Sequence, residues 1–122
     1  MIDSHCHLNF NELAENFHNI INNSKLNNIT SILSINTDPE DFEDHLNLIK
    51  NYNSVYLSYG LHPDKVDTFN QIQLQNFDIA CKNEKVIGIG ETGIDLYYSQ
   101  NHLREQTQVF ETHIEASIKH SL

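Results

Sequence analysis

Two histidines near the N-terminus, His5 and His7, have the spacing of a metal-ligand pair. We expect residues 2–6 to form a short strand, and successive side chains of a strand point to opposite faces. His5 and His7 therefore point the same way, whereas Cys6 points toward a core. Neutral imidazole nitrogens bind divalent cations, so the pattern predicts one metal ion shared by both rings. Two ligands do not complete such a site, and the others must come from later in the chain.

Glu91 is the residue best placed to join the two histidines. It follows Ile87-Gly88-Ile89-Gly90, an apolar run whose glycines allow close backbone packing. A carboxylate at the end of that strand can ligate one cation or bridge two. The alternative is a helix-start glutamate favoured by the helix dipole. Beside the two histidines, we predict the ligand role.

Three further polar residues are expected near the same place. His62 lies between Gly60 and Pro63 and could donate to a substrate phosphate, the alternative being a turn residue fixed by the proline. Asp95 could accept from a ligand imidazole or contact substrate, the alternative being a turn or capping aspartate. Asp3 is expected to orient the histidines or their ions.

The other histidines are expected on helix surfaces among polar neighbours, and these are His18, His45, His102, His113 and His120. Tyr97 and Tyr98 are predicted either to rim the site or to pack locally. Cys6 and Cys81 are isolated thiols without a C-x-x-C spacing, which is typical of reduced, buried cysteines in a cytoplasmic protein.

The composition narrows the range of partners. The chain has 122 residues, enough for one domain, and a formal net charge of -10 at pH 7. Its few lysines and arginines are scattered along the sequence, whereas proteins that bind nucleic-acid phosphates usually cluster such residues on one face. Bound cations must therefore supply most of the positive field if the substrate is a phosphate ester. The chain shows neither a run of about 18 apolar residues nor a signal-peptide pattern, so we expect a cytoplasmic protein without a membrane partner.

Four β-α units are expected to position these residues. Strands are predicted over residues 2–6, 29–36, 55–61 and 86–90, and helices over 11–24, 37–53, 70–82 and 102–120. This alternation indicates an α/β fold with parallel strands. The candidate site residues follow the first, third and fourth strands, where open sheets and barrels place their sites.

Two of the helices carry more specific expectations. The one that starts at Thr37 is expected to be capped by that residue, with Pro39 in its first turn and Glu40 three residues after the cap. The last helix is expected to bury one stripe, made of Leu103, Thr107, Phe110, Ile114 and Ile118.

Residues 88–93 also match G-x-G-x-x-G, the pattern of dinucleotide-binding loops. Three observations count against that function. Glu91 inside the loop would repel a pyrophosphate, the motif follows the fourth strand, and no helix starts directly after it. A flavodoxin- or Rossmann-like binding domain is therefore a weaker hypothesis than the two that follow, a hydrolase and an inactive half-barrel.

The motifs at residues 2–8, 60–63 and 89–95, together with the helix around 106–110, resemble the TatD-like metal-dependent deoxyribonucleases. The resemblance implies a TIM barrel that hydrolyses phosphodiester bonds of DNA with one or two divalent ions, Mg²⁺, Mn²⁺ or Zn²⁺. By position, His5 and His7 would hold the first ion and Glu91 would bridge two. His62 and Asp95 would lie near the substrate phosphate or beside the ligands. Asn9 stands where the family usually has an aspartate.

The length matches only part of such a barrel, which takes about 200 residues or more. The chain is therefore expected to be a single partial TIM-barrel domain over residues 1–122, its N-terminal (βα)4 half, truncated before a fifth strand that in the family carries a third histidine. Its open strand edges are expected to be covered by the missing C-terminal half or by self-association. The alternative to a hydrolase is an inactive half-barrel remnant or interaction module that lacks the later ligands.

Overall fold

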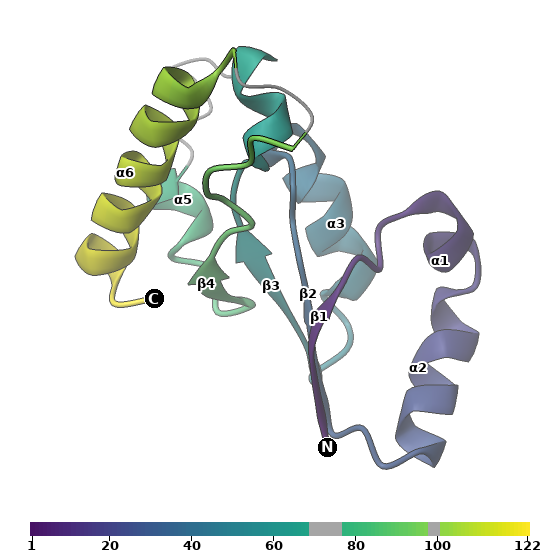
Figure 1. Ribbon diagram of the computed structural model, residues 1–122. Coiled ribbons are helices and arrows are strands. Elements are labelled where there is room, and N and C mark those ends of the chain that lie inside the picture. Colours follow the sequence, from purple (N-terminus) through teal and green to yellow (C-terminus); the bar gives the residue numbers. More distant parts are fainter. Residues whose placement is uncertain (69–76, 98–100) are drawn as a thin grey trace.

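The computed structural model describes residues 1–68, 77–97 and 101–122 of the chain (Figure 1). Among the elements of these residues, no helix combines the length and apolar character needed to cross a membrane. In chain order the elements are β1 (Ile2–Cys6), α1 (Asn11–Glu15), α2 (Phe17–Leu26), β2 (Ser31–Ser34), η1 (Pro39–Asp41), α3 (Phe42–Ile49), β3 (Val55–Tyr59), η2 (Pro63–Thr68), α5 (Phe77–Ala80), β4 (Val86–Ile89) and α6 (Leu103–His120).

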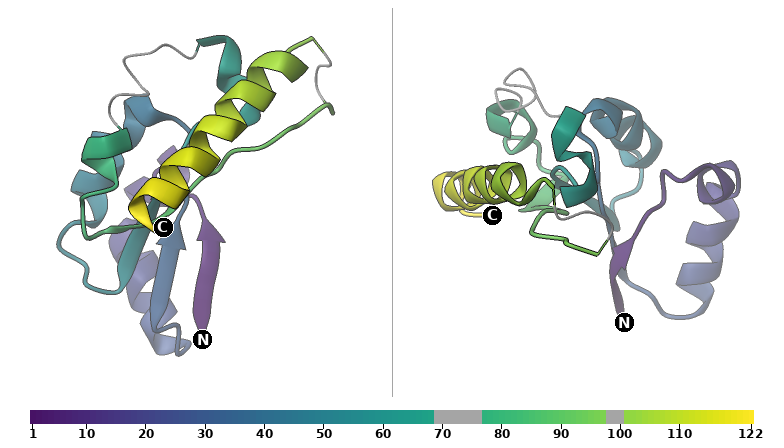
Figure 2. Two further views of the ribbon diagram at one scale, coloured as in Figure 1. Left: turned by 90° about the vertical axis from the view of Figure 1, so that its left-hand side faces the viewer. Right: turned by 45° about the horizontal axis from the view of Figure 1, so that its top comes forward.

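The four strands form one parallel sheet in the order β1-β2-β3-β4, which confirms the predicted α/β arrangement. Each strand pairs with the next one along the chain, so all carboxyl ends lie at the same edge of the sheet. In the right-hand view of Figure 2, α6, α3 and α2 follow one another around the sheet. The helices therefore cover one face of the sheet, and the loops after the strands meet at one end of it.

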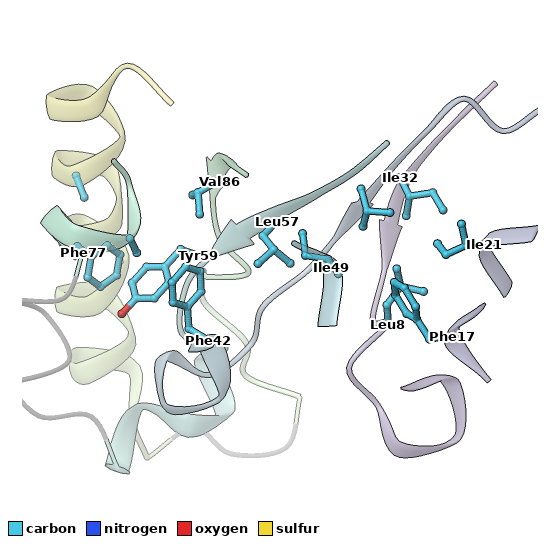
Figure 3. Close-up of a cluster of buried hydrophobic side chains, with 13 residues drawn as sticks. Leu8, Phe17, Ile21, Ile32, Phe42, Ile49, Leu57, Tyr59, Phe77 and Val86 are labelled. Atoms are coloured by element: carbon cyan, nitrogen blue, oxygen red, sulfur yellow. The ribbon is translucent and has the colours of Figure 1, made fainter. Parts of the chain in front are cut away.

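The core lies between the sheet and these helices (Figure 3). On β3, the alternate residues Val55, Leu57 and Tyr59 are all at most 1% exposed, because every second side chain of a strand faces the helices. The Tyr59 ring meets Phe42 and Phe77 edge to face, with centroids 4.8 Å apart in each pair. Burial of these rings and aliphatic side chains holds the strands in register.

Several predicted boundaries differ from those observed. The helix expected over residues 11–24 is interrupted at Asn16, which separates α1 from α2. Strands β2, β3 and β4 end one or two residues earlier than predicted. Of the helix predicted over 70–82, residues 70–76 lie outside the described residues, and of the described residues 77–82 only Phe77–Ala80 (α5) are helical.

The cap of the helical segment after β2 is Asp38, not Thr37. Asp38 Oδ1 accepts from the Glu40 backbone N–H at 3.0 Å, and the Asp38 backbone is extended as a cap requires. The Thr37 carbonyl instead accepts from the His62 N–H at 2.9 Å. Threonine and aspartate are both good caps, so their adjacency left the sequence pattern ambiguous by one residue.

The buried stripe predicted for α6 is wrong. Leu103, Ile114 and Ile118 are 45%, 43% and 76% exposed, while Thr107 and Phe110 are half-buried. The fully buried positions of the helix are Gln106, Val109, His113 and Ala116. Two of these are polar and satisfy their side chains with backbone groups, so a count of apolar residues selected the wrong face.

The prediction that His45 and His113 lie on helix surfaces is also wrong, because each is only 1% exposed. His18 is exposed as predicted, and His102 and His120 are half-buried. His45 Nε2 lies 2.8 Å from the hydroxyl oxygen of Ser34. Burial, with a smaller contribution from His7, lowers the pKa of His45 from 6.5 to about 4.

Acid should therefore destabilise the fold through His45. Between pH 6.5 and about 4 the unfolded chain binds a proton that the folded chain does not, so the free energy of unfolding falls as the pH falls across this window. The total loss should be about 3 kcal/mol. Urea denaturation at several pH values measures it. A His45→Gln variant should show a shallower slope, and an unchanged slope would contradict the assignment.

Candidate metal centre

Three side chains from β1 and β4, the two outer strands of the sheet, converge where the carboxyl ends of the strands lie. His5 belongs to β1, His7 follows β1 directly, and Glu91 follows β4. Their ligand atoms all lie within 4.8 Å of one another. In a flat sheet the two intervening strands would hold β1 and β4 roughly 14 Å apart. The curvature of the sheet and the reach of the side chains therefore bring the three residues together.

The geometry fits a cation shared by these groups. His5 Nε2 and His7 Nε2 lie 3.7 and 3.8 Å from Glu91 Oε2, too far for hydrogen bonds. Bonds of about 2.0–2.2 Å to a tetrahedral ion place ligand atoms roughly 3.3–3.6 Å apart, so small side-chain shifts complete the fit. Two imidazole nitrogens and a carboxylate oxygen suit zinc and other divalent ions. The predicted ligands are thus together, and ion binding by them stays a prediction.

The ring of His7 is oriented by its surroundings. Its Nδ1 lies 3.3 Å from the Ile35 carbonyl, so this nitrogen donates a proton and Nε2 is left to face Glu91. Phe10 stacks on the His7 ring, with centroids 4.8 Å apart and an angle of 13° between the planes. The His7 side chain is 24% exposed and that of His5 is 57% exposed. His7 is therefore the better ordered ligand of the pair.

The backbone that follows His7 is anchored in the core. The Leu8 N–H donates to Ser34 Oγ at 3.0 Å, and that hydroxyl in turn bonds His45 Nε2 at 2.8 Å. Because the neutral ring accepts the hydroxyl proton, the serine oxygen is free to accept from Leu8. A buried histidine of α3 thus supports the segment that carries the two histidine ligands.

The position of Glu91 depends on a close approach of two glycines. The Gly90 N–H donates to the Tyr59 carbonyl and the Glu91 N–H donates to the Asn36 carbonyl, each at 3.0 Å. A Cβ atom on Gly60 would lie 2.4 Å from the carbonyl carbon of Gly90. Only glycine at position 60 therefore lets the ends of β3 and β4 meet in this way.

His62 approaches the same carboxylate from the loop after β3. Its Nε2 lies 3.7 Å from Glu91 Oε1, and its Nδ1 lies 2.5 Å from Asp64 Oδ1. Asp64 occupies Nδ1 through its carboxylate and its backbone N–H, so Nε2 is the atom that faces the metal centre. Asp64 was not among the predicted site residues, although its place two residues after His62 was an available signal.

Two predicted aspartates have local contacts. Asp95 Oδ1 accepts from the Tyr97 N–H at 2.8 Å, which is the turn alternative, and its contact with substrate stays a prediction. Asp3 Oδ1 accepts from the backbone N–H of His5 at 3.2 Å rather than from its ring. Tyr97 is 84% exposed, and Tyr98 lies outside the described residues.

A pocket of about 520 Å³ opens beside these side chains. His7, His62 and Glu91 line it, together with Phe10. Its acidic groups include Asp41 and Asp64 as well as Glu91, and its lysine, Lys65, pairs with Asp38 at 3.1 Å. Carboxylates outnumber the positive charges there, so an anionic substrate needs bound cations to enter this pocket.

Comparison with known proteins finds relatives about twice as long. A protein of Buchnera aphidicola subsp. Baizongia pistaciae (strain Bp), described as an uncharacterized metal-dependent hydrolase, is 36% identical over 121 residues, which are 97% of this chain and 45% of that protein. YjjV of Escherichia coli (strain K12), described in the same words, is 24% identical over 123 residues, which are 99% of this chain and 48% of YjjV. The chain thus spans about half the length of the curated relatives it matches.

The fold corresponds to half of a larger barrel. The crystal structure of YjjV, a TatD homologue from E. coli K12, matches with a TM-score of 0.91 at 24% sequence identity, covering 100% of this chain and 48% of that one. The predicted (βα)4 half of a TIM barrel is confirmed, and the flavodoxin- or Rossmann-like alternative is wrong. The family model described as TatD related DNase matches residues 2–122. The chain therefore belongs to the TatD-related DNase family.

Proposed function

We propose that this chain carries the metal centre of a hydrolase that cleaves phosphodiester bonds of DNA. The observation that carries the proposal is the convergence of His5, His7 and Glu91 at one edge of the sheet. The description of the relatives as metal-dependent hydrolases and the match to the TatD-related DNase family support it. One or two divalent ions, Mg²⁺, Mn²⁺ or Zn²⁺, are the cofactors we propose.

His5 and His7 would hold one ion through their Nε2 atoms, and Glu91 would share it or bridge to a second. Ions bound there would supply charge that polarises the phosphoryl oxygens and lowers the pKa of a bound water. The Nδ1 atom of His62 is occupied by Asp64, so its Nε2 is the atom available to a phosphate oxygen. Donation from Nε2 to a phosphate oxygen requires a proton on that nitrogen as well as on Nδ1.

The state of the cysteines supports a cytoplasmic location, which we include in the proposal. Cys6 and Cys81 are both unpaired. Burial raises the pKa of each thiol to about 11, so neither is a reactive thiolate at neutral pH. Cys6 packs against the core as predicted.

A second candidate function is that of a half-barrel that binds a partner through its open edges. In the sheet of the described residues, β1 pairs only with β2 and β4 pairs only with β3. Ile87 of β4 is 48% exposed, and Ile114 and Ile118 of α6, which line a pocket with Ile89 of β4, are 43% and 76% exposed. We propose that these edges are covered either by additional residues, since the relatives are longer, or by a second copy of the chain. Light scattering of the purified chain distinguishes a dimer from a monomer.

A Glu91→Gln variant tests the proposed hydrolase. The substitution removes the carboxylate charge at nearly constant volume, so metal-dependent cleavage of bis(p-nitrophenyl) phosphate and of single-stranded DNA should fall by at least about 100-fold. We expect slow turnover by the 122-residue chain, because three ligand atoms converge in it, so the ratio of the two rates is the measurement.

Glu111→Gln, the same change at an exposed position of α6, is the matched control and should leave the rate unchanged. Equal rates for the wild-type chain and Glu91→Gln would contradict the role of Glu91. Cleavage of a carboxylic ester without cleavage of either phosphodiester would contradict the substrate class.

A further inference from the structure

We propose that Gln106 and His113, two buried polar residues on one face of α6, position the loops that carry His62 and Asp95. The geometric part of this proposal stands on contacts within the chain. Only its consequence for phosphate binding rests on the proposed function.

The side-chain amide of Gln106 ties the loop after β3 to the loop after β4. Its Nε2 donates to the Pro63 carbonyl at 3.1 Å and to the Asp95 carbonyl at 2.9 Å. Its Oε1 accepts from the Asp95 N–H at 2.9 Å. Gln106 is 3% exposed, and these bonds use both amide protons and the oxygen. One side chain therefore fixes two backbone segments relative to each other.

His113 holds the first of these loops from a point two turns further along α6. Its Nδ1–H donates to the Val109 carbonyl at 2.7 Å, which leaves Nε2 to accept from the Leu61 N–H at 3.0 Å. Phe77 packs edge to face on the ring, with centroids 4.7 Å apart, and fixes its plane. Burial lowers the pKa of His113, which keeps the ring a neutral acceptor.

His62 lies between the two anchored residues. Leu61 is bonded to His113 and Pro63 is bonded to Gln106, so the backbone is held on both sides of His62. These contacts set the place from which the His62 ring reaches Glu91 Oε1, 3.7 Å from its Nε2.

A purely structural helix face would be filled at lower cost by apolar side chains, because a buried polar group destabilises unless all its bonds are made. α6 has apolar residues, but it turns Leu103, Ile114 and Ile118 outward. The buried polar pair instead stands where the helix meets the site loops, and both members are fully bonded. Their placement therefore indicates that Gln106 and His113 position the site loops and do not merely fill the core.

Two variants that keep volume but remove hydrogen bonds test the proposal, Gln106→Met and His113→Phe. Amide hydrogen exchange should accelerate by at least about tenfold at Asp95 in the first and at Leu61 in the second, the fold-change expected when one buried hydrogen bond is lost. The exchange of Ile32, whose N–H donates to the Ser54 carbonyl, should stay unchanged. The NMR signals of the His62 ring should shift in both variants.

Gln108→Met, the same substitution at an exposed position of α6, is the matched control and should alter none of these signals. His113→Gln keeps an acceptor and should restore slow exchange at Leu61. The Zn²⁺ affinity should change by less than about threefold in every variant, because none of them touches His5, His7 or Glu91.

Acceleration of all amides alike, Ile32 included, would overturn the proposal, because it would show a role in global stability. An unmoved His62 signal in both variants would overturn it as well. Inorganic phosphate titrated into the zinc-loaded protein should bind about tenfold more weakly to either variant than to the wild-type chain. Failure of the wild-type chain to bind phosphate would count against the proposed function alone, since exchange and the His62 signal are measured without phosphate.

Discussion

Replacing both His5 and His7 by alanine is expected to lower the affinity for Zn²⁺ or Mn²⁺ by more than about 100-fold. The double change removes two of the three converging ligand atoms and leaves Glu91 alone. Loss of a partner that only orients a ligand already costs about 10–100-fold, so loss of two ligands should cost more. Isothermal titration calorimetry with each metal measures the change.

The single variants should not be equal. His7 donates to the Ile35 carbonyl and stacks on Phe10, whereas His5 is more exposed, so His7→Ala should cause the larger loss. His18→Ala, on an exposed face of α2, is the control. An unchanged affinity in the double variant would exclude the site at this edge of the sheet.

Replacing Gly60 by alanine is expected to be the most destabilising single change near the site. The new Cβ would lie 2.4, 2.6 and 2.7 Å from the carbonyl carbon, Cα and oxygen of Gly90, all of them backbone atoms that cannot rotate away. Because the two strand ends must move apart, the free energy of unfolding should fall by about 3 kcal/mol or more. It should also displace Glu91 and lower the metal affinity about tenfold.

Gly88 provides a matched control on the next strand. A Cβ there would meet nothing within 4 Å, so Gly88→Ala should change the free energy of unfolding by less than about 1 kcal/mol. Urea denaturation and calorimetry on both variants separate the two sites. Equal effects would show that the contact between Gly60 and Gly90 is not what positions Glu91.

The sequence alone was enough to predict the framework of the site. The β-branched and apolar runs at 31–34 and 55–59 have the period of strands, and their alternation with helices indicates parallel order. Because parallel strands end at one edge, residues placed just after them, such as His7 and Glu91, could be expected to meet. That inference needs only chain order and the period of a strand.

The supporting contacts could not be predicted in the same way. His45 and His113 stand among polar neighbours on their helices, and whether a helix buries a histidine depends on a partner far away in the chain. Their partners are Ser34 Oγ and the Leu61 N–H, one a small side chain and the other a backbone group. A backbone donor leaves no signature in sequence, so the inward face of α6 was assigned from apolar residues alone.

The separation of the ligands along the chain gives the metal centre a second consequence. A cation bound by His7 and Glu91 would link the end of β1, the first strand of the sheet, to the end of β4, the last. Only a chain with every strand pairing in place offers both ligands, so such an ion binds the native state and not the unfolded one. At a free concentration of 100 times its Kd it would add about 2.7 kcal/mol to the free energy of unfolding. The supply of metal would then govern how long the folded chain persists.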